Sequence, residues 1–334
     1  MTTTEGKILL GVDIGGTKVA AGLVSSSGEI LHTSRTHMIA RRSAGEGFEA
    51  VLKAVDGAFR SRVARKVPGI GISLPGWVDS RRGVLLGATN LPCWRDFPLA
   101  REVEKRYGLA TRLANDANVA ALAEAAWGAG KGYRSVFYVT LGTGIGTGIV
   151  LQHRLCEGRT GAAGEGGHMT INFRGPLCGC GKRGCIETYA SGMAIARRAG
   201  EMLGQGRARR SRLFKMAGGR LENVTAEIVS RAAYAGDALA AKILVEAADH
   251  FAVWLGNIID LLEPDIIVVG GGIGHLMLSF LERMRARLKT WAINPRQQQV
   301  PIVEARFGPE SALVGAAALF LPRARLWHSP RSSA

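Results

Sequence analysis

The chain has 334 residues, of which 47% are hydrophobic and 21% are charged. This length allows two domains of ordinary size, each with its own core, and it excludes a single small module. The composition excludes an intrinsically disordered chain. The formal net charge of +16 fits nucleic-acid binding, attraction of a polyanionic ligand or an arginine-rich surface, and the scattered basic residues favour the last.

The N-terminal sequence and the spacing of the cysteines both favour a reducing compartment. The N-terminus is short and polar, and Asp13 interrupts the apolar run that follows it, so we expect neither a signal peptide nor a membrane span. We therefore expect a cytoplasmic protein. Three of the five cysteines lie within residues 178–185, which in such a compartment favours metal binding over disulfides.

The first part of the chain predicts an α/β unit. Strands are expected over residues 8–13, 19–24 and from 29 on, joined by tight turns into an antiparallel meander. Apolar residues in helical spacing predict a helix over 46–63. A buried strand over 69–74, a helix over 99–107, a short strand over 111–114 and a helix over 119–127 are expected to follow.

A second unit begins near Ser135 with a similar pattern. Two strands are expected to flank a glycine turn over 142–148. Two such units about 130 residues apart indicate a duplicated α/β core with a cleft between the halves. Beyond the cysteines we expect mostly helix, including 238–262, then a strand over 266–270 and a last helix over 311–320.

Three glycine-rich segments have features of ligand-binding loops. The segment 13–18, Asp-Ile-Gly-Gly-Thr-Lys, offers backbone N–H groups, a hydroxyl and an ammonium to phosphate oxygens, but it equally suits an ordinary hairpin turn and lacks Walker A spacing. In the turn 142–148 glycines alternate and a strand follows, which disfavours a dinucleotide fingerprint. The triplet 270–272 follows a buried strand and would let a base or ribose approach closely, although a triplet alone is weak evidence.

Asp116 lies in the segment Asn-Asp-Ala-Asn, residues 115–118, where a strand gives way to a helix. A carboxylate at such a position is usually a helix N-cap. The functional alternative is a general base within reach of a substrate hydroxyl. The sequence leaves both interpretations open.

One histidine and three cysteines form the strongest constellation. His168, Cys178, Cys180 and Cys185 are the ligand types of a closed tetrahedral zinc site, and the glycines between them allow a tight loop. The spacing is not that of a DNA-reading zinc finger, and reactive or merely buried cysteines are the alternative. Glu165 and Glu187 flank the cluster and are either acceptors for sugar hydroxyls or solvated charges.

Together these motifs resemble the ROK family, named for repressors, open reading frames and kinases, from about Ile8 to Phe320. The resemblance implies an α/β chain with the actin-like ATPase (ribonuclease H-like) fold, in two lobes with a central cleft that holds the nucleotide. The implied small lobe spans 1–118, with a helix at about 311–321 packing back on it. The large lobe, with zinc and nucleotide sites, spans 119–310, and a basic tail over 322–334 is expected to be disordered.

The resemblance also implies roles for single residues, with ATP, Mg²⁺ and structural Zn²⁺ as cofactors. The nucleotide would be bound by Asp13, Gly15, Gly16, Thr17, Lys18, Gly142, Thr143, Gly144, Gly146, Gly271 and Gly272. The sugar would be held by Gly76, Asn90, Asn115, Asp116, Glu165, His168 and Glu187. Asp13 would organise the metal and phosphates, Asp116 would be the base, and His168 would place one ring nitrogen on zinc and the other toward a sugar hydroxyl.

The implied activity is an ATP-dependent hexose kinase, with glucose as the first choice of substrate. Kinases for N-acetylmannosamine, N-acetylglucosamine or fructose are the alternatives. Trp77 follows Pro-Gly where typical glucokinases carry a small residue or proline, so the preferred hexose stays open. ROK regulators carry a helix-turn-helix domain ahead of this core, whereas seven residues precede Ile8, so we expect an enzyme. We also expect a homodimer or homotetramer without nucleic-acid or membrane partners.

Overall fold

A computed structural model describes residues 7–63, 66–204 and 211–321 of the chain. These residues form two compact units. Unit 1 contains the described residues up to Tyr138, then Gly148–Gly164, and the described residues from Ala305 on. Unit 2 contains Val139–Thr147 and Glu165–Glu304. The expected lobe boundaries at residues 118 and 310 stay predictions, and the expected disorder of 322–334 concerns residues outside those described.

Unit 1 is built on a mixed sheet whose described strands run in the order β3-β2-β1-β4-β8. The strands are β1 (Leu9–Ile14), β2 (Lys18–Val24), β3 (Ile30–His37), β4 (Ile70–Leu74) and β8 (Thr111–Asn115). Pairing of β1 with β2 and of β2 with β3 is antiparallel, which confirms the predicted meander. Pairing of β1 with β4 and of β4 with β8 is parallel, so these three strands end at the same edge.

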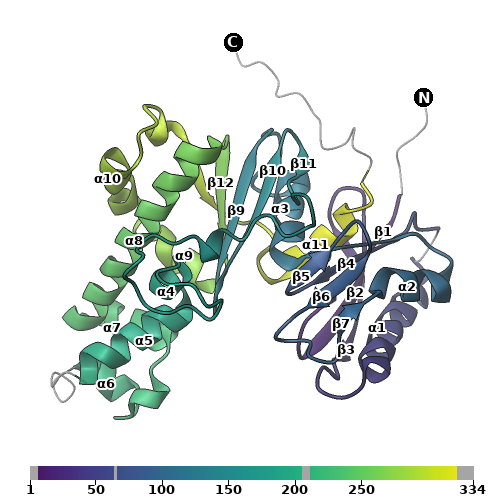
Figure 1. Cartoon of the computed structure of the whole chain (residues 1–334), viewed down its shortest axis with the longest axis horizontal. Helices are drawn as coiled ribbons and strands as arrows, with labels where there is room; N and C mark the ends of the chain where they lie inside the picture. Colours follow the sequence, from purple (N-terminus) through teal and green to yellow (C-terminus); the bar gives the residue numbers. More distant parts are fainter. Residues whose placement is uncertain (1–6, 64–65, 205–210, 322–334) are drawn as a thin grey trace. The chain divides into compact units, whose positions relative to one another are not determined.

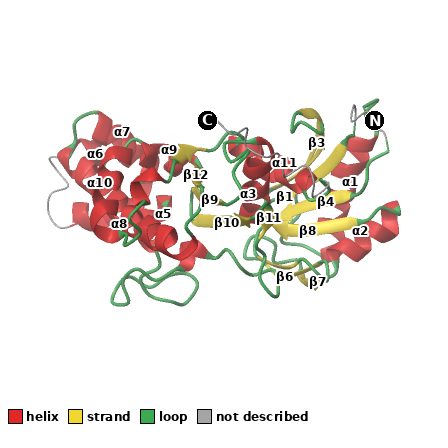
Figure 2. Ribbon diagram, turned by 90° about the horizontal axis from the view of Figure 1, so that it is seen from above, coloured by secondary structure: helices red, strands yellow, loops and turns green. Residues whose placement is uncertain are grey.

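Helices cover both faces of this sheet, with α1 and α2 on one face and α3 and α11 on the other (Figures 1 and 2). Their bounds are α1 (Ala44–Phe59), α2 (Leu99–Tyr107), α3 (Asp116–Trp127) and α11 (Ser311–Ala318). Ser43 and Glu46 form a capping box at the start of α1. The helix ends four residues before the predicted Val63, because the apolar spacing stops at Phe59 and Val63 is exposed.

Backbone-to-backbone contact joins α11 to the central strands. A Cβ atom at Gly71 would lie 1.8 Å from the carbonyl oxygen of Ala316, and one at Gly11 would lie 2.2 Å from that of Leu313. Glycine is therefore required on this face of β1 and β4, because any side chain would push the helix off the sheet.

A small antiparallel sheet in unit 1 follows β4. It consists of β5 (Trp77–Asp79), β6 (Val84–Gly87) and β7 (Arg95–Phe97). Gly76 enters it with a φ of +88°, a conformation that favours glycine, and a Cβ atom there would lie 2.3 Å from the carbonyl oxygen of Gly87. Trp77 follows with 61% of its surface exposed.

A second sheet has the strand order β11-β10-β9-β12-β13 among the described residues. The strands are β9 (Val136–Leu141), β10 (Ile145–Leu151), β11 (Arg154–Leu155), β12 (Ile266–Gly270) and β13 (Ile302–Glu304). The predicted strand over 266–270 is confirmed. The predicted turn over 142–148 is wrong at its end, because β10 begins at Ile145 and Gly146 and Gly148 lie within the strand. Gly148 is needed for packing, since a Cβ atom there would lie 2.5 Å from the carbonyl oxygen of Ala117.

The helices of unit 2 gather around α8, the long central helix in Figure 1. They are α4 (Glu187–Ala190), α5 (Gly192–Met202), α6 (Arg212–Met216), α7 (Ala226–Tyr234), α8 (Ala238–Leu262), α9 (Gly272–Leu278) and α10 (Leu281–Trp291). The bounds of α8 match the predicted helix. Asp237 caps its start by accepting the N–H of Ala240, and Glu263 ends it in the left-handed region.

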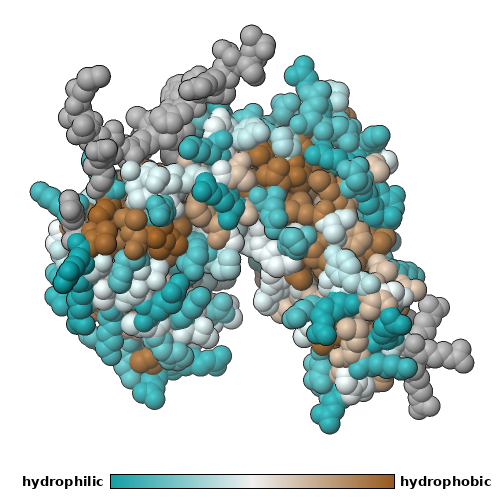
Figure 3. All heavy atoms as spheres, turned by 180° about the vertical axis from the view of Figure 1, so that it is seen from behind, coloured by the Kyte–Doolittle hydropathy of each residue, from teal (hydrophilic) through white to brown (hydrophobic). Residues whose placement is uncertain are grey.

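The surface is largely hydrophilic in the view of Figure 3, with separate apolar areas on both units. Apolar side chains are mostly buried, and the exposed large ones include Trp77 in unit 1 and Phe173 and Ile293 in unit 2. Within the described ranges, no helix combines the length and the hydropathy needed to cross a bilayer.

The packing of α11 gives a stability prediction. Gly71→Ala should lower the free energy of unfolding by about 1–3 kcal/mol or more, because the added methyl group would overlap the backbone of α11. Gly87→Ala is the matched control, since its Cβ atom would meet nothing within 4 Å. Thermal unfolding followed by circular dichroism compares the two. Equal melting temperatures for both variants would contradict this account of the packing.

Candidate functional site

In unit 1, the first glycine turn lies where β1 passes into β2. The N–H of Gly15 donates to the carbonyl oxygen of Lys18 at 2.9 Å, which closes the turn. Thr17 and Lys18 are exposed. A Cβ atom at Gly16 would lie 2.9 Å from the carbonyl oxygen of Asn90. The turn and the Asn90 loop therefore touch, so a phosphate-type turn and a predicted sugar-binding residue lie side by side.

Asp13 is the second-last residue of β1, close to this turn, and lies opposite Ser73 in the parallel ladder. Burial raises the pKa of the Asp13 carboxyl, and Glu310 adds to the rise, while the Ser73 hydroxyl and the Lys18 ammonium oppose it. The net shift is upward, so the ionised form is disfavoured in its present surroundings. A cation bound nearby would favour that form.

Asn115, and not Asp116, is the N-cap of α3. The Asn115 Oδ1 accepts the N–H of Ala117 at 2.9 Å, and its Nδ2 donates to the carbonyl oxygen of Gly76 at 3.1 Å. Asp116 is the first residue of the helix, is exposed, and its Oδ1 also accepts the N–H of Ala117 at 2.8 Å. The helix thus begins at 116 and not at the predicted 119, and the N-cap interpretation of Asp116 is wrong. A carboxylate in a first helical turn is stabilised in its ionised form, as a base requires.

In unit 2, the second glycine turn is shorter than predicted and is held from outside. The N–H of Gly142 donates to the carbonyl oxygen of Gly144 at 3.0 Å, and the N–H of Gly192, at the start of α5, donates to that of Gly142 at 2.8 Å. Gly271 precedes α9 with a φ of +83°, and a Cβ atom there would lie 2.2 Å from the carbonyl oxygen of Leu141. Gly272 begins α9. The turn and the glycine triplet are therefore neighbours.

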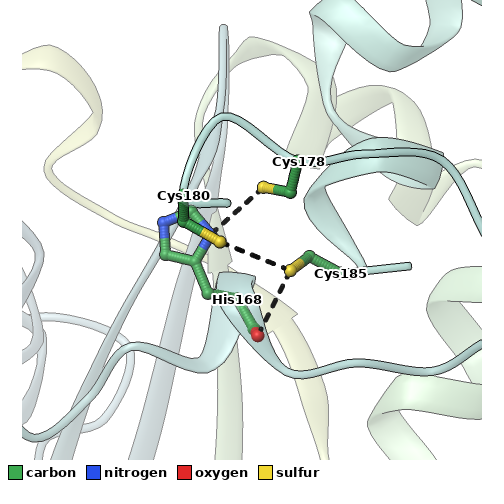
Figure 4. A group of neighbouring side chains, drawn as sticks. All are labelled: His168, Cys178, Cys180 and Cys185. Carbon is green, nitrogen blue, oxygen red and sulfur yellow. Dashed lines mark hydrogen bonds between the residues drawn. The ribbon is translucent and has the colours of Figure 1, made fainter. Parts of the chain in front are cut away.

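The histidine and three cysteines point toward one another in unit 2 (Figure 4). One ligand atom from each of His168, Cys178, Cys180 and Cys185 lies within 4.8 Å of all the others. His168 ends the short 3₁₀ helix η1 (Gly166–His168), and the cysteines lie on the loop that precedes α4. The predicted grouping of these four residues is confirmed.

The distances in this cluster fit zinc. A tetrahedral ion with Zn–S bonds of about 2.3 Å places two sulfurs about 3.8 Å apart, and a sulfur and an imidazole nitrogen about 3.6 Å apart. Sγ of Cys180 and Sγ of Cys185 are 3.7 Å apart, and Sγ of Cys178 lies 3.5 Å from Nδ1 of His168. Nδ1 would thus face the ion, which leaves Nε2 of His168 for another partner.

Protonation of two of the three thiols, Cys178 and Cys185, opposes metal binding, because burial raises the pKa of each. Desolvation acts in the same direction on Cys180, but hydrogen bonds from the Lys182 backbone and from the other two thiols outweigh it and lower the pKa of Cys180. Burial, with the neighbouring Cys180 and Cys178, raises the pKa of Cys185 to about 12. A cation would have to displace this proton, because the thiolate is the ligand.

The two glutamates that flank the cluster differ in their surroundings. Glu165 is exposed, and its carbonyl oxygen accepts the N–H of His168 at 3.1 Å. Glu187 begins α4, and its Oε2 accepts the N–H of Ile145 at 2.8 Å. Its Oε1 lies 3.8 Å from Sγ of Cys178 and 3.9 Å from Nδ1 of His168. Glu187 is therefore not a freely solvated charge.

Two residues that hold η1, the short helix that ends at His168, were not identified from the sequence. The Thr147 hydroxyl accepts the N–H of Gly166 at 2.9 Å, and the indole N–H of Trp254 donates to the carbonyl oxygen of Gly166 at 3.0 Å. The available signal was a tryptophan inside the apolar helix α8, since a buried indole usually has an acceptor.

Within each unit the structure therefore brings the predicted site residues into groups. In unit 1, Asn90 touches the turn at Gly16, and Asn115 holds Gly76 beside Asp116. In unit 2, Glu187 contacts both the metal-ligand cluster and the strand that follows Gly144. The binding and catalytic roles of these residues stay predictions.

Comparison with known proteins identifies close relatives over nearly the whole chain. The model of the ROK family matches residues 9–323. A glucokinase of Streptomyces coelicolor is 37% identical over 314 residues, which cover 93% of this chain and 97% of that protein. An N-acetylmannosamine kinase of Yersinia pseudotuberculosis is 34% identical over 308 residues, covering 92% and 96%.

Solved structures give the same result. The crystal structure of a ROK family glucokinase from Streptomyces griseus, in complex with glucose and AMPPNP, has a TM-score of 0.76 and 36% sequence identity. The likeness covers 93% of this chain and 98% of that one. The predicted α/β class with the actin-like ATPase fold is confirmed.

The cluster gives a metal prediction. Cys180→Ser should lose zinc, because a hydroxyl is a far poorer zinc ligand than a thiolate. Cys156→Ser is the matched control, since Cys156 lies outside the cluster. Metal analysis of the purified proteins should find one zinc per chain in the wild type and in Cys156→Ser, and much less in Cys180→Ser. A wild-type protein that takes up no zinc when supplied with it would contradict this assignment.

Proposed function

We propose, because the chain belongs to the ROK family, that it is an ATP-dependent hexose kinase that converts glucose to glucose 6-phosphate. The observation that carries the proposal is the near full-length match to glucokinases, one of which was solved with glucose and a nucleotide analogue. The two glycine turns can bind phosphate, and the carboxylates of Glu165 and Glu187 can accept hydrogen bonds from sugar hydroxyls, as this reaction requires.

The proposed reaction is direct in-line transfer. The sugar hydroxyl oxygen attacks the γ-phosphorus, the bond from that phosphorus to the β–γ bridging oxygen breaks, and ADP leaves. Asp116 accepts the hydroxyl proton. Its position in the first turn of α3 puts its carboxyl group at the positive end of the helix dipole, and Asn115 fixes the start of the helix by holding Gly76 and Ala117.

The phosphate end of ATP is assigned to the glycine turns. Backbone N–H groups of Gly15 to Lys18 and of Gly142 to Gly144 would donate to phosphate oxygens, and the Lys18 ammonium would add positive charge. Asp13 would hold the Mg²⁺ end, where the ion neutralises charge on the transferring group when it is bound. Gly271 and Gly272 would let the adenosine approach closely.

The sugar is assigned to polar groups next to the metal cluster and the Asn90 loop. Zinc would fix the His168 ring through Nδ1, so that Nε2 faces a sugar hydroxyl. Glu165 and Asn90 are exposed and supply further hydrogen-bonding atoms. ATP and hexoses are cytoplasmic metabolites, so a cytoplasmic location belongs to the proposal, and the homo-oligomeric state stays a prediction.

Two observations support a second substrate class. The N-acetylmannosamine kinase relative is nearly as similar to this chain as the glucokinase relative. Trp77 adds an exposed aromatic side chain directly after Gly76, which Asn115 holds. An aromatic surface at this point would suit a larger hexose as well as glucose.

Substrate choice has a direct test. With ATP and Mg²⁺, we expect glucose to give the largest kcat/KM in a coupled assay over hexoses and N-acetylhexosamines. A much larger value for N-acetylmannosamine would keep the kinase and replace the substrate. Phosphorylation of no sugar would contradict the enzymatic proposal.

The catalytic role of Asp116 has a matched pair of variants. Asp116→Asn should lower kcat by about 10² to 10⁴, because the amide cannot accept the hydroxyl proton. Its melting temperature should hardly change, since Asn115 supplies the cap. Asn115→Ala should instead lose about 1 kcal/mol of stability through the lost cap. If Asp116→Asn kept more than about a tenth of kcat with phosphoryl transfer rate-limiting, the base assignment would be wrong.

A further inference from the structure

Glu187 lies between the metal-ligand cluster and the second glycine turn, and it contacts both. Its Oε2 accepts the backbone N–H of Ile145, the residue that follows the turn, at 2.8 Å. The same oxygen lies against Gly144, where a Cβ atom would be only 2.5 Å away. Its Oε1 lies 3.8 Å from Sγ of Cys178. The side chain is 19% exposed, so water competes little for these contacts.

A second connection runs through the backbone from the cluster to the same turn. Cys185 is followed by α4 and then by the start of α5. There the N–H of Gly192 donates to the carbonyl oxygen of Gly142 at 2.8 Å, and the N–H of Met193 donates to that of Thr143 at 3.4 Å. The segment that follows the metal ligands in the chain therefore forms hydrogen bonds with the turn from Gly142 to Gly144.

We propose that Glu187 is a positioning residue that couples metal binding at the cluster to nucleotide binding at the glycine turn. The inference rests on the proposed function, because it takes the turn to be a phosphate-binding element. A metal ion would fix His168 and Cys185, and Glu187, two residues farther on, would then hold the N–H of Ile145 in place. Zinc would thus serve the nucleotide as well as the sugar.

Restraints from outside would strengthen nucleotide binding because the turn has few restraints of its own. Glycines at 142 and 144 leave its backbone wide conformational freedom, which costs entropy when a phosphate is bound. The bond from the N–H of Ile145 to Oε2 of Glu187 restricts this backbone from outside the turn. A turn that is fixed before the nucleotide arrives pays less of this entropy on binding.

The resemblance assigned Glu187 to the sugar, and side-chain chemistry separates that role from the positioning role. Glu187→Gln keeps an oxygen that accepts the N–H of Ile145 but removes the charge offered to a sugar hydroxyl. Glu187→Ala removes both. Nucleotide affinity should therefore be rescued by glutamine and lost with alanine, whereas a role toward the sugar alone would leave nucleotide affinity unchanged in both variants.

The experiment measures the Kd of AMPPNP with Mg²⁺ by calorimetry, without sugar, on full-length protein of known zinc content. Glu187→Ala with zinc bound should bind the nucleotide about tenfold more weakly than the wild type, a size usual for coupling between sites. Glu187→Gln should bind it nearly as well as the wild type while its KM for sugar rises. Glu222→Ala, an exposed glutamate of the same unit, is the matched control.

Zinc removal completes the test. Chelation should weaken AMPPNP binding to the wild type by a similar factor and should change the Glu187→Ala variant little further. An unchanged nucleotide Kd in both zinc-free wild type and zinc-loaded Glu187→Ala, with weaker sugar binding, would overturn the inference but leave the kinase intact. If zinc-free protein unfolds, the alanine and glutamine variants decide the question by themselves. A zinc-loaded wild type that binds no AMPPNP would overturn the proposed function as well.

Discussion

Backbone contact between α11 and its neighbours is the constraint on which the architecture of unit 1 depends. On one side α11 touches β1 and β4 at Gly11 and Gly71. On the other, a Cβ atom at Gly315 would lie 1.8 Å from the carbonyl oxygen of Val119 in α3. Because α11 packs this closely on both sides, it fixes the ends of β1 and β4 and the start of α3 relative to one another. Asp13 and Asp116 occupy those positions, so a change at a remote glycine would displace groups assigned to chemistry.

Elements with local signals could be predicted from the sequence, and elements shaped by distant contacts could not. Helix α8 has a capping aspartate, a continuous apolar stripe and a proline soon after its end, and its bounds were correct. The glycines at 146 and 148 resembled a turn because the sequence does not show which distant residues pack against a strand. Gly148 is glycine because α3 packs on β10. The sequence did not single out the cap of α3, because Asn115 and Asp116 are adjacent and both residue types suit that role.

The same difference between local signals and distant contacts applies to the candidate functional site. The metal-ligand cluster was predictable because three closely spaced thiols and one imidazole are the ligand types of a closed tetrahedral zinc site, and such a combination has few other uses. The partners of Glu187 and Trp254 were not, since each bonds to a backbone group that every residue carries. Sequence identifies the groups that do chemistry more readily than the hydrogen bonds that position them, because backbone donors and acceptors leave no mark in the side-chain pattern.

Two carboxyl groups of unit 1, those of Glu124 and Asp13, differ in what surrounds them. Glu124 is 0% exposed and accepts three backbone N–H groups, from Ala129, Arg306 and Phe307, at 2.8 to 3.0 Å. Its charge is compensated within the fold. Burial instead raises the pKa of Asp13, and neither Ser73 nor Lys18 outweighs it. A cation bound beside the glycine turn would favour the ionised form of this carboxyl group, which agrees with the proposal that Asp13 lies at the Mg²⁺ end of ATP.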